Sequence, residues 1–60
     1  MSGTVFLEFI RVGQQLKVNA IDEATGIEVS VFGPVNGSRT ELQSIAIQKL
    51  RRRLEREGQA

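Results

Sequence analysis

Apolar and polar residues alternate along three stretches of the first half of the chain. Residues 4–12 read T-V-F-L-E-F-I-R-V, residues 15–22 read Q-L-K-V-N-A-I-D, and residues 27–32 read I-E-V-S-V-F. A period of two in segments rich in β-branched and aromatic residues is typical of strands with one buried face. The pattern therefore predicts strands over 4–12, 15–22 and 27–32.

Short turns join these segments. Gly13-Gln14 fits a two-residue hairpin turn with glycine at its first central position. Residues 22–26 read D-E-A-T-G, in which the aspartate can bond the backbone ahead of it and the glycine supplies a positive φ. Gly33-Pro34 is expected to end the third strand, because proline lacks the N–H that a continuing strand needs. These turns predict an antiparallel meander with the middle strand at its centre.

The turn lengths also predict the register. They place Phe9 opposite Val18 and Ala20 opposite Val29, and a slip of one residue would turn the apolar side chains to the other face. One face then carries nine apolar residues: Val5, Leu7, Phe9, Leu16, Val18, Ala20, Ile27, Val29 and Val31.

The second half of the chain has helical periodicity. Ser38 with Glu41 fits a capping box, and Thr40 with Gln43 offers a second candidate start. Basic residues crowd the last turns and Gly58 follows them, as is typical of a helix end. The apolar stripe consists of Leu42, Ala46, Leu50 and Leu54, widened on its two sides by Ile45 and Ile47. A helix over about 39–57 should therefore cover the apolar face of the sheet.

Length and composition fit one small globular domain over residues 1–60. The chain has 40% hydrophobic and 25% charged residues, and a domain of this size buries only about 60% of its unfolded surface. The predicted fold class is α+β: a three-stranded antiparallel β-meander packed against one C-terminal α-helix (βββα) in two layers.

Composition also argues against several classes of function. The chain has no cysteine, so it can form neither a disulfide nor a thiolate metal site, and a reducing cytoplasm is the expected location. No apolar run approaches the roughly 20 residues of a membrane span. The first residues, M-S-G-T, lack the basic region of a signal peptide. We therefore expect a cytoplasmic protein with no membrane partner.

Catalytic side chains are scarce. Without His, Cys, Tyr or Trp, the available bases and nucleophiles are carboxylates, lysines and hydroxyls. Asp22 and Glu23 lie in a predicted turn, and Glu8 and Glu28 lie on different edge strands with the central strand between them. Residues 33–37 contain two glycines before a helix but no Gly-Lys-Ser/Thr phosphate loop. The sequence predicts no enzyme, no catalytic residue, no metal, no cofactor and no small-molecule substrate.

A basic band lies near the end of the predicted helix. It consists of Lys49, Arg52, Arg53 and Arg56, with Arg51 on another side. A basic helix face can bind nucleic-acid phosphates or an acidic partner. However, the i,i+4 pairs Arg51–Glu55 and Arg53–Glu57 would neutralise part of the charge, and the net charge of the chain is only +1. A solvated helix end is the favoured interpretation, and a nucleic-acid-binding accessory protein is the alternative function.

The sheet face turned away from the helix is unusually apolar. A solvated antiparallel face should be polar, although scattered surface hydrophobes are common. This outer face carries Phe6, Ile10, Val12, Ile21 and Phe32, among Glu8, Lys17, Asn19, Glu28 and Ser30. It favours a small non-catalytic interaction module that forms a homodimer or binds a protein partner.

Several short segments occur together in one known family. They are E-F-I-R-V-G at 8–13, V-N-A-I-D at 18–22, T-G-I-E-V at 25–29, G-P at 33–34, and E-L, A and K-L within 41–50. The chain resembles a family of short, uncharacterised bacterial proteins, mostly alphaproteobacterial. The resemblance implies a bacterial cytoplasmic protein of unknown function and transfers no catalytic or binding residue. Ile10 departs from the polar residue of that family, so an interface through Ile10 need not be general.

Overall fold

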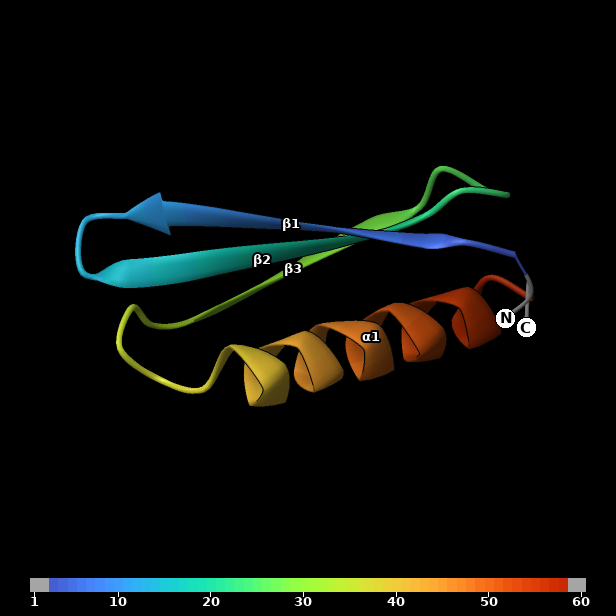
Figure 1. The fold of residues 1–60 in the computed structure, drawn as a ribbon. Coiled ribbons are helices and arrows are strands. Elements are labelled where there is room, and N and C mark those ends of the chain that lie inside the picture. The colour runs from blue at the N-terminus through green and yellow to red at the C-terminus, as the bar shows by residue number, and fades with distance from the viewer. Residues whose placement is uncertain (1–2, 59–60) are drawn as a thin grey trace.

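The computed structural model describes residues 3–58. Strands β1 (Val5–Val12), β2 (Gln15–Asp22) and β3 (Glu28–Pro34) form one antiparallel sheet in the order β1-β2-β3, and helix α1 (Arg39–Arg56) follows. The helix lies along one face of the twisted sheet (Figure 1). Phe9 is opposite Val18, and Ala20 is opposite Val29. The predicted α+β class, the βββα order and the register are confirmed.

Both turns have the backbone conformation and the hydrogen bonds that their residues predict. Gly13 has a φ of 60° and Gly26 a φ of 75°, values that L-residues with a Cβ seldom adopt. At the second turn, Asp22 Oδ2 accepts hydrogen bonds from Thr25 N at 3.1 Å and from Thr25 Oγ1 at 2.7 Å. Asp22 is only 2% exposed, so its side chain is part of the structure of the turn.

The bounds of two strands differ from the prediction. The first strand begins at Val5 rather than at residue 4. The third runs over Glu28–Pro34 rather than 27–32, and Pro34 pairs with Gln15. The strand ends at Gly33-Pro34, as predicted, but these two residues are the last two of the strand rather than the first two after it, because β3 is an edge strand. A proline can sit at such an edge when the missing N–H would face away from the sheet.

The helix begins at the first of the two candidate starts. Ser38 is the N-cap, and its Oγ accepts a hydrogen bond from Glu41 N at 3.1 Å. At the other end the helix stops at Arg56, one residue before the predicted end, with Glu57 as C-cap. Gly58 follows with a φ of 75°, the left-handed conformation that commonly terminates helices.

The core lies between α1 and the two strands beneath it. The helix packs closely on β3 and β2 but hardly approaches β1. The buried core consists of Leu16, Val18, Ala20, Val29, Leu42, Ala46, Leu50 and Leu54. Around it the partly buried residues are Val5, Leu7, Phe9, Ile27 and Val31. The apolar face of β1 is therefore only half covered.

Candidate protein-binding surface

The outer sheet face exposes several large apolar side chains, as the alternation predicts. The fractions exposed are 50% for Phe6, 40% for Ile10, 53% for Val12 and 54% for Phe32. Ile21, the fifth residue of the predicted interface, is only half-exposed. It lies opposite Phe6 on the neighbouring strand.

A polar row divides this face in two. Ser30 Oγ donates a hydrogen bond to Asn19 Oδ1 at 2.6 Å, and Asn19 Nδ2 donates one to Glu8 Oε1 at 3.1 Å. The row crosses all three strands, and Asn19 is buried within it. The five predicted interface residues therefore form two clusters rather than one patch. Phe6 and Ile21 lie on one side of the row.

The larger cluster lies at the hairpin end of the sheet. Val12 follows Ile10 on the same face of β1, and Lys17 separates Ile10 from Phe32 in the next row. The Lys17 ammonium is 5.9 Å from the centre of the Phe32 ring, a cation–π arrangement that lays its aliphatic stem across the gap. We call Ile10, Val12, Phe32 and the exposed Pro34 the hairpin-end patch.

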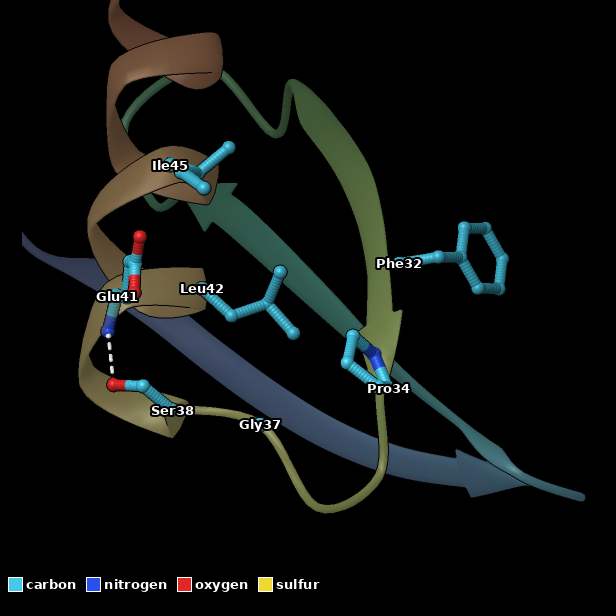
Figure 2. A pocket seen from close by; sticks show the side chains of 7 residues that line it. All are labelled: Phe32, Pro34, Gly37, Ser38, Glu41, Leu42 and Ile45. Carbon is cyan, nitrogen blue, oxygen red and sulfur yellow. Dashed lines mark hydrogen bonds between the residues drawn. The ribbon is translucent and has the colours of Figure 1, made fainter.

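A shallow pocket adjoins this patch at the edge of β3 (Figure 2). Its lining residues are Phe32, Pro34, Gly37, Ser38, Glu41, Leu42 and Ile45, and its volume is about 330 Å³. Leu42 and Ile45 point from the helix toward β3, whereas the Phe32 ring points away to the outer face (Figure 2).

Ile45 was predicted to widen the buried stripe of the helix, but it is 48% exposed. Its side chain lines the pocket on the helix side (Figure 2). Because Phe32 and Pro34 belong to both surfaces, apolar exposure continues from the outer face around β3 to the helix.

The structure separates the members of the basic band. Lys49, Arg52 and Arg56, together with Glu55, line one open hollow on the helix surface. Arg53 is half-buried and forms a salt bridge with Glu57 at 3.0 Å, as its i,i+4 spacing predicts.

One further contact and one unformed ion pair reduce the capacity of this band to bind an anion. Lys49 Nζ donates a hydrogen bond to Ser30 O at 2.8 Å, so its charge is partly engaged. Between Arg51 and Glu55, both in the described part of the chain, there is no ion pair. Glu55 therefore stays available to oppose Arg52 and Arg56 inside the hollow.

The acidic residues do not converge. Within residues 3–58, no group of three or more His, Cys, Asp or Glu side chains is placed to hold a metal ion. Glu8 and Glu28 lie on opposite edge strands, and Asp22 serves its turn. In the same described range, no helix is long and apolar enough to cross a membrane.

Fold and surface together define a small βββα domain with an apolar outer face and one adjoining pocket. Residues 2–57 match the family model described as "Domain of unknown function (DUF6898)". The chain belongs to this family. No curated protein and no solved structure matches the chain.

Proposed function

We propose that this protein is a small, non-catalytic interaction module that binds a protein partner, a second copy included, through its outer sheet face. The observation that carries the proposal is the continuity of the hairpin-end patch with the pocket at Leu42 and Ile45. Exposed apolar surface of this kind marks protein-binding sites on small domains. A concave pocket beside it offers a place for one anchoring side chain of the partner.

The rest of the molecule supports a binding role rather than catalysis. The pocket is lined mainly by apolar side chains, and its one acidic residue, Glu41, lies in the first turn of the helix, where a carboxylate complements the helix dipole. The absence of cysteine in the sequence supports a cytoplasmic location. The resemblance noted above supports a bacterial one.

The test compares three baits in a pull-down from the native cell, followed by mass spectrometry. The double variant Phe32→Glu/Ile45→Lys places charges in the patch and beside the pocket, at residues exposed enough to leave the fold intact. Glu28→Lys is the matched control, since it changes charge on the same face but away from the patch. A partner captured by wild type and Glu28→Lys but not by the double variant supports the proposal. Equal capture by all three contradicts it.

A nucleic-acid-binding accessory protein is the second candidate function. It is supported by the hollow in which Lys49, Arg52 and Arg56 come together. Its test is salt-dependent retardation of a duplex or a single strand. Retardation should be lost in Arg52→Glu/Arg56→Glu and kept in Phe32→Glu/Ile45→Lys. No binding at low salt ends this candidate.

A further inference from the structure

Each edge strand of the sheet directs the backbone groups of every second residue away from its neighbour. In an antiparallel pair, alternate residues direct both their N–H and their C=O toward the neighbouring strand. Glu23 N donates to Thr4 O, and Asp22 N donates to Ile27 O. By this alternation, the even-numbered residues of β1 bond to β2. The backbone groups that face the free edges therefore belong to odd-numbered residues on β1 and to even-numbered residues on β3.

The free edge of β3 is interrupted at two of its outward-facing residues. Pro34 is one of its outward-facing residues and has no N–H to offer. The outward C=O of Ser30 already accepts the hydrogen bond from Lys49 Nζ. Proline and lysine at an edge are devices by which proteins prevent a further strand from pairing.

The free edge of β1 has neither device. Its outward-facing backbone groups belong to Val5, Leu7, Phe9 and Arg11, and no hydrogen bond found within residues 3–58 uses them. The Arg11 side chain folds toward the hairpin, where its Nε donates to Gly13 O at 2.9 Å. A strand of eight residues without proline or glycine thus presents an unpaired ladder.

The inner face of β1 is also incompletely covered. Val5, Leu7 and Phe9 are half-buried because α1 lies over β2 and β3. The Arg39 guanidinium lies over the Phe9 ring at 5.4 Å, so one long side chain from the first turn of the helix reaches this strand. A half-covered apolar face next to an open edge would gain burial if the sheet continued past β1.

We propose that β1 pairs antiparallel with β1 of a second copy, so that two molecules form one continuous six-stranded sheet. A two-fold axis perpendicular to the sheet relates the copies, and each donates to the other through its outward-facing residues. The axis keeps both helices on the same side, with the two half-covered β1 strands between them. This inference goes beyond the proposed function, because it rests on the β1 edge and not on the outer face.

The charge pattern disfavours the registers that are shifted toward the hairpin. Placing Leu7 opposite the partner's Leu7 sets Val5 opposite the partner's Phe9, so that only apolar side chains meet on the inner face. Shifting the pairing by two residues toward the hairpin sets Glu8 opposite the partner's Glu8. This like-charge pair across adjacent strands is destabilising. The next shift sets Arg11 against the partner's Leu7. The self-complementarity of the first register is the reason to name a second copy as the occupant.

Amide hydrogen exchange of the wild-type protein, followed residue by residue by NMR, tests this pairing. In an isolated molecule, the amides of Val5, Leu7 and Phe9 face solvent and should exchange much faster than those of Phe6, Glu8 and Ile10. At high micromolar concentration, pairing should bring the first set to the protection of the second. Rapid exchange of the first set in a sample whose mass is that of a dimer overturns the proposal.

Sedimentation of two matched variants separates the edge from the outer face. Leu7→Lys directs a charge into the shared inner face and should weaken dimerisation on the order of a hundredfold, because the axis doubles each substitution. Phe32→Glu/Ile45→Lys should leave the dimer intact. The reverse result overturns the edge pairing and supports self-association through the outer face. A wild-type protein that stays monomeric at high concentration overturns the proposal that a second copy pairs with the β1 edge. The hairpin-end patch would then be left to bind a different partner.

Discussion

The two edge strands of this sheet are supported in opposite ways. β3 has the helix above it, a lysine bonded to its free edge and a proline at its end. β1 is connected through a two-residue turn, and its inner face is half covered. Both strands pair with β2 in the same antiparallel manner, so the backbone pairing does not explain the difference.

The position of the helix explains why β3 is covered and β1 is not. A three-stranded sheet is wider than one helix, because strands lie about 4.8 Å apart and helix surfaces are about 10 Å across. One helix can cover two strands well or three strands poorly. Here the buried stripe packs over β2 and β3, so the molecule concentrates its stability on one side and leaves the other available for association.

The largest expected effect comes from truncating the covered side. Leu50 is fully buried, so Leu50→Ala should lower the free energy of unfolding by about 2–5 kcal/mol, enough to unfold much of a domain this small. Leu7→Ala on β1 removes the same atoms from a half-buried site and should cost about half as much or less. Urea titrations of both variants in dilute solution, followed by circular dichroism, measure the ratio.

The contrast between the covered and the half-covered strand fails if Leu50→Ala and Leu7→Ala lower the free energy of unfolding equally at low protein concentration. It is sharpened if the loss of unfolding free energy caused by Leu7→Ala grows as the protein concentration rises, while the loss caused by Leu50→Ala stays constant. Only a residue that gains burial on association should show such dependence, because association stabilises the folded state by mass action.

A smaller effect is expected at the turn that connects β2 to β3. Asp22→Ala removes the acceptor of both Thr25 hydrogen bonds and should cost about 1–2 kcal/mol. Asp22→Asn keeps a carbonyl oxygen that can accept both bonds, but it places an amide nitrogen where the buried carboxylate oxygen Oδ1 has no partner within the described residues. The asparagine variant should therefore lose less stability than the alanine variant, although its buried N–H groups cost part of what the retained acceptor saves. Thermal unfolding of the pair measures this, and equal losses would show that the retained acceptor does not offset the loss of the carboxylate.

The sheet was predictable because its turns determine the register. Two residues at Gly13-Gln14 and the Asp22 turn leave one pairing that keeps the apolar residues on one face. The stop at Gly33-Pro34 was predicted, but the inclusion of both residues in β3 was not, because a proline can be the last residue of a strand that lies at an edge. That error matters for function, since Pro34 lines the pocket and lies on the outward-facing edge.

The candidate surface was predictable only in part. Alternation assigns Phe6, Ile10 and Phe32 to the outer face, and the exposures agree. The predicted register already aligned Glu8, Asn19 and Ser30, and that row was the signal that the patch is divided. The exposure of Ile45 had no such signal. A four-residue stripe indicates which side of a helix faces the sheet, but not above which strands the helix lies.

The smallest effect on stability, with a distinct effect on assembly, is expected from opening the edge of β3. The double variant Lys49→Met/Pro34→Val restores an outward N–H and frees the Ser30 carbonyl, while each exposed substitution should change the free energy of unfolding by no more than about 0.5 kcal/mol. A sheet with two open edges can pair at both, which produces ribbons rather than closed dimers. Light scattering against concentration should show species larger than a dimer. Lys49→Met alone is the control, because Pro34 still interrupts that edge. If the double variant keeps the wild-type mass, the lysine and the proline are not what protects β3, and the contrast between the two edges loses its explanation.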